Sequence, residues 1–192
     1  SNQSVAVNNQ ERERDSSYIN EESPEAAQEY LDRIEKIYNI PGNEKETIKL
    51  ASIALRLHKS DLAYFYRAYA KYELEDYQGA ITDYTKTIKI SPDYRNAYIN
   101  RGMAKDELED HRGAITDYTK AIKIDPDYKS SYLNRGISKR KLEDYQGAIT
   151  DYTKAINIDR NYRNAYFNRG YVKDELEDYQ GAISDYTKAI KI

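Results

Sequence analysis

A phrase of thirteen residues recurs four times along the chain at a constant step of 34 residues. LEDYQGAITDYTK stands at 74–86 and at 142–154, and near-copies stand at 108–120 and 176–188. Periods of about 20–50 residues are typical of repeat architectures, in which each supersecondary unit stacks on the next. The sequence therefore predicts a stacked array in which every layer offers the same contacts to its neighbours.

One repeat, residues 95–128, has the pattern of two helices. Small and apolar residues follow helical spacing in 96–108, and 111–124 is amphipathic. Asp110 precedes the second helix and is expected to cap it, and Pro126 follows the helix and ends it. Each unit is therefore predicted to be an antiparallel helical hairpin. One hairpin cannot bury both of its apolar faces, so the copies must stack.

The repeat resembles the tetratricopeptide repeat family in its period and in its small, large and turn positions, which are Tyr98, Gly102, Ala114, Tyr118, Ala121 and Pro126. The resemblance implies an all-α, right-handed superhelical solenoid with four units, at 61–94, 95–128, 129–162 and 163–192. Three positions depart from the pattern: Ala68 replaces the glycine, Thr87 replaces the last alanine, and Arg160 replaces the proline.

An arginine stands at position 7 of every unit, where the family often has leucine: Arg67, Arg101, Arg135 and Arg169. In an antiparallel hairpin this position lies opposite a recurring aspartate: Asp83, Asp117, Asp151 and Asp185. A partly buried arginine needs an acidic partner. We therefore expect each arginine to pair with the aspartate of its own unit, which is favoured over a ladder of ligand-binding arginines.

The segment before the repeats is divided in two by its composition. Residues 1–20 are polar and lack a period, so we expect a disordered N-terminal segment. Residues 21–60 contain two helical patterns, 23–38 and 44–59, with Ser23 and Pro24 as a start signal. We interpret 21–60 as a divergent helical hairpin that caps the array. The chain has the features of a piece of a longer protein, and helix 179–191 is expected to expose the apolar face that a further unit would cover.

The composition argues against several classes of function. The net charge is −3, so the basic surplus of a nucleic-acid-binding protein is absent. No apolar run approaches the roughly 20 residues that span a bilayer. The chain has no cysteine and two histidines, too few for most transition-metal sites, and it lacks a phosphate-binding loop that would indicate a cofactor. His111 replaces a recurring tyrosine, which favours a packing role. We therefore expect no enzyme, metal or cofactor, and the compartment is left open.

The remaining candidate site is a surface. In tetratricopeptide arrays the first helix of each unit lines the concave face. The resemblance therefore implies the following peptide-binding residues: Phe65, Ile99, Leu133 and Phe167 at position 5; Tyr66, Asn100, Asn134 and Asn168 at position 6; Tyr69, Met103, Ile137 and Tyr171 at position 9; and Asn96, Asn164, Asp106, Arg140 and Asp174 at positions 2 and 12. Apolar side chains exposed in a row between polar ones are typical of a binding groove, and asparagine offers both a donor and an acceptor to a peptide backbone. In the alternative interpretation, the apolar residues pack between adjacent first helices and the asparagines are solvated or bond locally.

The function predicted from these patterns is a non-catalytic scaffold or adaptor that binds a peptide or protein segment on the concave face. Some family members hold a C-terminal carboxylate with lysine or arginine at positions 2, 5 or 6, and none stands there in this chain. Two alternatives remain open. The array is a self-association module that forms homo-oligomers through the last helix or the concave face, or it is a spacer within a larger enzyme or regulatory protein.

Overall fold

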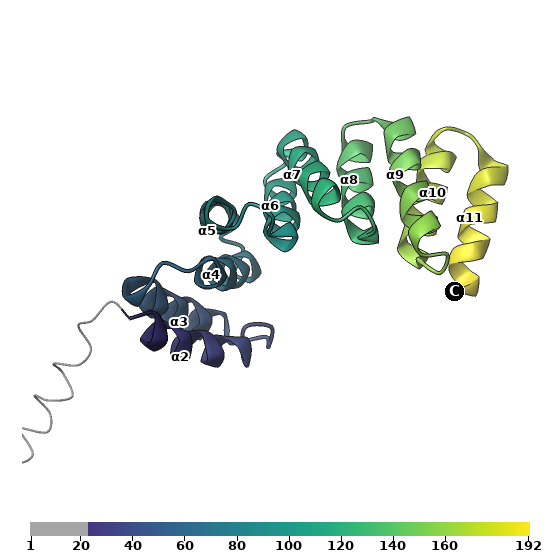
Figure 1. The fold of residues 1–192 in the computed structure, drawn as a ribbon. Coiled ribbons are helices and arrows are strands. Elements are labelled where there is room, and N and C mark those ends of the chain that lie inside the picture. The colour runs from purple at the N-terminus through teal and green to yellow at the C-terminus, as the bar shows by residue number, and fades with distance from the viewer. Residues whose placement is uncertain (1–22) are drawn as a thin grey trace, which may run out of the picture.

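The computed structural model describes residues 23–192, and the prediction of disorder for 1–20 lies outside them. The described residues form ten α-helices and no strand (Figure 1). These are α2 (Pro24–Glu35), α3 (Glu44–Leu57), α4 (Asp61–Glu73), α5 (Tyr77–Ile90), α6 (Arg95–Glu107), α7 (His111–Ile124), α8 (Lys129–Lys141), α9 (Tyr145–Ile158), α10 (Arg163–Glu175) and α11 (Tyr179–Lys191). None of these helices is long and apolar enough to cross a bilayer.

The helices are arranged as a solenoid, because each one packs on the next along the sequence. The first helices of successive pairs also touch: α2 contacts α4, α4 contacts α6, α6 contacts α8, and α8 contacts α10. No such contact joins the second helices within residues 23–192. The array therefore curves toward α4, α6, α8 and α10, whose common surface we call the first-helix face.

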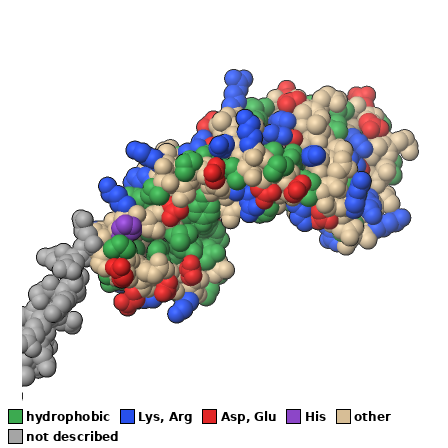
Figure 2. All heavy atoms as spheres, viewed as in Figure 1, with side chains coloured by type: hydrophobic (Ala, Val, Ile, Leu, Met, Phe, Trp, Pro, Cys, Tyr) green, Lys and Arg blue, Asp and Glu red, His purple; other side chains and the backbone are tan. Residues whose placement is uncertain are grey.

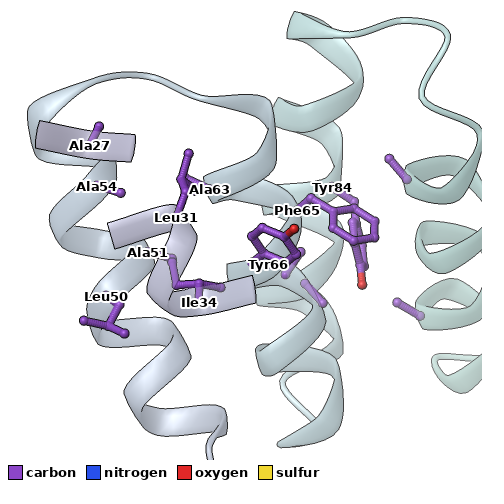
Figure 3. Packing of buried hydrophobic residues seen from close by; sticks show 14 residues of the cluster. Ala27, Leu31, Ile34, Leu50, Ala51, Ala54, Ala63, Phe65, Tyr66 and Tyr84 are labelled. Carbon is purple, nitrogen blue, oxygen red and sulfur yellow. The ribbon is translucent and has the colours of Figure 1, made fainter. Parts of the chain in front are cut away.

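The N-terminal pair α2/α3 packs on α4 as one continuous apolar cluster. Leu31 and Ile34 of α2 and Leu50 of α3 are buried in this cluster, together with Phe65 of α4 (Figure 3). The Ser23 side chain accepts a hydrogen bond from the Ala26 amide, and Pro24 opens the helix, as the sequence predicts. Helix α2 ends at Glu35, earlier than the predicted 38, because the chain tightens into successive turns.

The turn inside each tetratricopeptide-like unit is built from a leucine, a glutamate and an aspartate. Glu109 adopts a left-handed conformation, with φ of 62°, and its amide donates to the Asp106 carbonyl. The Asp110 amide donates to the Lys105 carbonyl at 2.9 Å, which completes a Schellman motif. The Asp110 side chain then accepts from the Gly113 amide, so its predicted capping role is confirmed. A Cβ on Gly113 would lie 2.1 Å from the Asp110 carboxylate, so a larger residue here would displace the capping side chain.

The predicted pairing of arginine with aspartate is confirmed in all four units. In the first unit Arg67 Nε donates to Asp83 Oδ2 at 2.8 Å, and Nη2 donates to Oδ1 at 2.9 Å. The same two-bond pairing joins the other three pairs. The aspartates are buried, so these pairs connect the two helices of each unit through its interior.

Two further groups complete each pair, and we call the whole arrangement the seam cluster. A lysine lies 2.8 Å from each aspartate: Lys71, Lys105, Lys139 and Lys173. The third nitrogen of each arginine donates to a hydroxyl of the preceding hairpin, for example Arg135 Nη1 to Thr119 at 3.0 Å. The seam cluster therefore links neighbouring units as well as paired helices.

In the first and the last seam cluster, the surroundings of the aspartate favour its charged form. Burial acts to raise the pKa of Asp83, but hydrogen bonds from Arg67 and Lys71 outweigh burial and hold that pKa below the usual range of an aspartate. Asp185 has the same opposing influences from burial and from Arg169 and Lys173, with the same net direction.

The C-terminal end of the array exposes apolar side chains. Ile183 and Ile190 of α11 are 57% and 82% exposed, whereas Ile156, which stands one period before Ile190, is 2% exposed. Helix α10 covers α9, and no described helix covers α11 in the same way. The predicted exposure of an apolar face on this helix is confirmed.

Candidate functional site

Every residue predicted for the binding face lies on a first helix. Helix α4 carries Phe65, Tyr66 and Tyr69; α6 carries Asn96, Ile99, Asn100 and Met103; α8 carries Leu133, Asn134, Ile137 and Arg140; and α10 carries Asn164, Phe167, Asn168 and Tyr171. Because consecutive first helices touch, these residues form one band along the solenoid.

The expectation of an exposed apolar row is wrong for position 5. Phe65, Ile99 and Leu133 are only 6–7% exposed, because each lies between its own helix pair and the next. Phe65, for example, stacks on Tyr94, with 4.9 Å between ring centroids. Phe167 is 55% exposed, since no described unit follows α11. Phe65, Ile99 and Leu133 therefore pack between units, in agreement with the alternative interpretation.

The residues at position 6 do not behave alike. Tyr66 is buried, and its hydroxyl donates to Glu35 of α2 at 3.1 Å. The Asn168 side chain donates to the Asn164 carbonyl of its own helix at 2.8 Å. Asn100 and Asn134 are half-buried, and neither side-chain amide makes a hydrogen bond of standard geometry to another described residue, although the Asn100 amide lies close to the Tyr84 hydroxyl. The predicted row of backbone-binding asparagines is thus reduced to two side chains with free hydrogen-bonding groups.

Two cavities lie side by side on the first-helix face. The first, of about 150 Å³, lies between α4, α5 and α6 and is lined by Tyr69, Tyr72, Glu73, Tyr84, Asn100 and Met103. The second, of about 140 Å³, lies between α4, α6 and α8 and is lined by Tyr72, Met103, Asp106, Glu107, Tyr118, Asn134, Ile137 and Lys141. Tyr72 and Met103 belong to both linings, so the cavities adjoin. We call them the tyrosine cavity and the second cavity.

The surroundings of these cavities are acidic. Burial, followed by the charge of Glu107, raises the pKa of Tyr72 to about 12. Burial, followed by the charge of Glu73, also raises the pKa of Tyr69. Around the N-terminal half of the array, green side chains, a class that includes tyrosine, are gathered on the visible surface (Figure 2). The face therefore combines aromatic surface with negative charge.

Asp106 is held by three partners at the wall of the second cavity. Its carboxylate accepts from the Tyr118 hydroxyl at 3.0 Å and from Ser138 of the next unit at 2.6 Å. His111 Nδ1 lies 2.8 Å from the other carboxylate oxygen. The described residues contain no group of three or more histidine, aspartate or glutamate side chains suited to hold a metal ion.

Position 12 changes its chemistry from unit to unit. It is Tyr72, then Asp106, then Arg140, whose guanidinium lies over the Tyr171 ring at 5.1 Å from the centroid. Arg140 and Tyr171, both predicted to bind a peptide, therefore contact each other. Near Arg140, burial raises the pKa of Tyr152 to about 12, although the positive charge opposes this shift.

The sequence analysis missed Tyr72, Glu73 and Tyr84 as parts of a site. Tyr84 has the spacing of a core residue, and Glu73 is the last residue of α4, next to a recurring acidic turn. The sequence pattern alone therefore does not distinguish either residue from its structural counterparts in the other units. One signal was available: the first unit departs from the others at two positions one turn apart on the same helix, with Ala68 for glycine and Tyr72 for a charged residue.

Comparison with known families agrees with this architecture. Models of the tetratricopeptide repeat match residues 61–94, 96–128 and 164–192, and a model described as a TPR repeat matches 138–174. The chain therefore belongs to the tetratricopeptide repeat family. A search of curated protein sequences finds no significant match.

Several solved structures share the fold. MamA from Desulfovibrio magneticus RS-1 superposes with a TM-score of 0.79 at 19% identity, over 86% of this chain and 93% of that chain. YrrB, described as a TPR protein with an unusual peptide-binding site, gives 0.72 at 16% identity over 84% of each chain. The first TPR domain of Spaghetti (RPAP3), bound to an HSP90 peptide, gives 0.59 at 22% identity over 61% of this chain and 93% of that chain. Similarity at this level of identity establishes the shared solenoid fold.

Proposed function

We propose that the chain is a non-catalytic adaptor that holds an extended peptide or protein segment along the first-helix face. The observation that carries this proposal is the pair of adjoining cavities, which form a groove across α4, α6 and α8. A bound segment would place side chains in the cavities and offer backbone groups to Asn100 and Asn134, whose amides are free.

The family supports this proposal in general terms. Two solved structures of the same fold are described by their peptide ligand or peptide-binding site, YrrB and the Spaghetti domain. The groove is acidic, and it has no lysine or arginine clamp for a C-terminal carboxylate. Both features disfavour a ligand that is held by an acidic chain end. The partner is therefore expected to present itself as an internal, extended segment.

The test is peptide binding with a matched control. The wild type and an Asn100→Ala/Asn134→Ala variant are titrated with a library of unstructured peptides, and light scattering measures the mass of each sample. Asn168→Ala serves as the control because the Asn168 amide already bonds to its own helix. We expect the double variant to lose about tenfold or more in affinity, since two hydrogen bonds of about 1 kcal/mol each are removed.

Each result of the peptide titration either supports or contradicts the adaptor or the role of the asparagines. Loss of binding in the double variant, with the control unchanged and the mass constant, supports the adaptor. Equal binding by all three proteins contradicts the role of the asparagines. If no peptide binds the wild type at all, the adaptor function itself is contradicted.

A second candidate, self-association, is favoured by the exposed C-terminal end. A hollow of about 610 Å³ between α10 and α11 is lined by Arg163, Asn164, Phe167, Tyr186, Ala189 and Ile190. In the inner units the corresponding surface is covered by the next hairpin. An apolar patch of this kind can pair with the same patch on a second copy.

The second candidate is tested by the mass of the protein as a function of concentration. We expect Ile183→Lys/Ile190→Lys to abolish any rise in mass, because both side chains are exposed and a charge there does not disturb the interior. A wild type whose mass stays constant up to high concentration would contradict self-association.

A further inference from the structure

The tyrosine cavity is lined by Tyr84, whose hydroxyl is unpartnered. The Tyr84 side chain lies between α4 and α6, beside Phe65, with 5.7 Å between the ring centroids (Figure 3). Its hydroxyl is fully buried and has no hydrogen-bond partner. Burial raises the pKa of Tyr84 far above its usual value, and the nearby Asn100 amide slightly opposes this shift without forming a hydrogen bond of standard geometry. A buried hydroxyl without a partner costs about 1–3 kcal/mol, so this group calls for an explanation.

The second unit shows one way in which the same tyrosine can be satisfied, whereas the hydroxyl of Tyr152 in the third unit is also buried without a partner. Tyr118, which stands one period after Tyr84, donates to Asp106 at 3.0 Å. Asp106 occupies position 12, where the first unit has Tyr72. The acceptor that Asp106 provides in the second unit is therefore missing around Tyr84, and what sets Tyr84 apart from Tyr152 is that it lines the tyrosine cavity.

A second substitution in the first unit acts at the same place. In the second unit a Cβ on Gly102 would lie only 2.7 Å from the Tyr118 ring, so the ring approaches the first helix closely. In the first unit Ala68 carries that Cβ, and the Tyr84 ring cannot approach α4 as closely. Two changes one turn apart on α4 thus separate the first unit from the second, one by adding a methyl group and the other by removing a hydrogen-bond partner.

The charge of the cavity defines what it can accept. No lysine or arginine is among its lining residues, and Glu73 stands at its edge as an exposed carboxylate. The adjoining second cavity adds Asp106 and Glu107, against one lysine, Lys141, on the side of α8. An anionic group is therefore repelled, whereas a cation gains from the carboxylate and from the tyrosine rings.

We propose that the tyrosine cavity takes a basic side chain, lysine or arginine, of the segment that lies along the first-helix face. The cationic group pairs with Glu73, donates to the oxygen atoms of Tyr84 and Asn100, and packs its stem against Tyr69, Tyr72 and Met103. This inference rests on the proposed adaptor function and names the partner class as a segment with a basic residue at one fixed place.

The first experiment uses side-chain analogues, so that it does not depend on any peptide. The protein is titrated with n-butylammonium, which reproduces a lysine side chain, and with neutral N-butylacetamide, which reproduces an acetylated one. NMR signals of the Asn100 amide and of the Tyr84 ring report occupancy. We expect saturable shifts at both residues with the cation only. Equal responses to the two analogues, or no response to the cation, would overturn the inference.

Variants identify the groups that hold the cation. Glu73→Gln and Tyr84→Phe are each expected to weaken n-butylammonium binding by about threefold or more. Matched controls at equivalent positions away from the cavity are Glu175→Gln and Tyr152→Phe, which should bind like the wild type. Tyr84→Phe removes only an unpartnered hydroxyl, so a correct fold is expected and is checked by circular dichroism. Equal weakening by a variant and its control would overturn the assignment.

Peptides distinguish this inference from the adaptor function. A peptide from the library that binds is compared with its lysine-to-norleucine and its Nε-acetyl-lysine forms. Weaker binding of both forms supports the basic side chain. Equal binding of all three overturns the inference and leaves the adaptor intact. Saturation by n-butylammonium without any peptide binding supports the cavity and contradicts the adaptor.

Discussion

The seam clusters and the first-helix face follow different rules along the same four units. The seam keeps its arginine, lysine and aspartate in every unit, with nearly identical distances. The first-helix face changes position 12 from Tyr72 to Asp106 to Arg140, and its two adjoining cavities lie between α4, α6 and α8. The constant region holds the hairpins together and joins them to their neighbours. Substitutions on the variable first-helix face can change the ligand preference without disturbing the packing of the hairpins.

Breaking a seam cluster is expected to have the largest effect. Asp151→Ala leaves Arg135 and Lys139 without their buried partner, so we expect the free energy of unfolding in urea to fall by about 3–5 kcal/mol. Lys154→Ala, on the exposed side of the same helix, is the control and should change it by less than about 0.5 kcal/mol. A loss below about 1 kcal/mol for Asp151→Ala would mean that the seam cluster contributes little to the stability of the array.

Acid should weaken the seam without any substitution. The pKa values of Asp83 and Asp185 are depressed in the folded state, so the unfolded chain takes up protons first as the pH falls. The stabilisation is fully present above the unfolded pKa of about 3.9 and is lost as the pH falls through the lower folded pKa. Urea unfolding from pH 7 to pH 2 should therefore show a decline that begins near about pH 4. Asp83→Asn should make this decline shallower, and an unchanged slope would contradict the assignment.

The tyrosines at position 24 sharpen the comparison between the first and second units. Tyr118→Phe removes a hydrogen bond to the Asp106 carboxylate, and we expect a loss of about 1–3 kcal/mol. Tyr84→Phe removes a hydroxyl that is buried without a partner, so its free energy of unfolding should not fall and should rise by up to about 1–3 kcal/mol. Equal losses for the two variants would show that Tyr84 is satisfied in solution.

A modest effect is expected at the glycine of position 8. A Cβ on Gly136 would lie 2.6 Å from the Tyr152 ring, so Gly136→Ala forces the ring to shift. Overpacking costs about 1–3 kcal/mol, and alanine regains about 1 kcal/mol of helix propensity. We expect a net loss of roughly 1 kcal/mol in thermal or urea unfolding. A net gain in stability would mean that the ring moves aside freely.

Much of the fold was accessible from the sequence because it depends on local, repeated rules. The period, the cap at Asp110 and the pairing of Arg101 with Asp117 all follow from spacing within one hairpin. The candidate site was less accessible. Ile99 and Leu133 have the spacing of groove residues, but their burial depends on how closely the next hairpin approaches.

The sequence by itself determined the stack: a 34-residue period, amphipathic helices and an aspartate opposite each arginine allow one kind of assembly. Only the tertiary structure decided which side chains stay open on the first-helix face, because that depends on contacts between residues of different hairpins. Phe65 and Phe167 occupy the same position, yet one is buried and the other is exposed, since a neighbouring unit covers only the first. The unpartnered Tyr84 is equally invisible in the sequence, because its surroundings are set by Ala68, Tyr72 and Asn100 from two hairpins meeting in space.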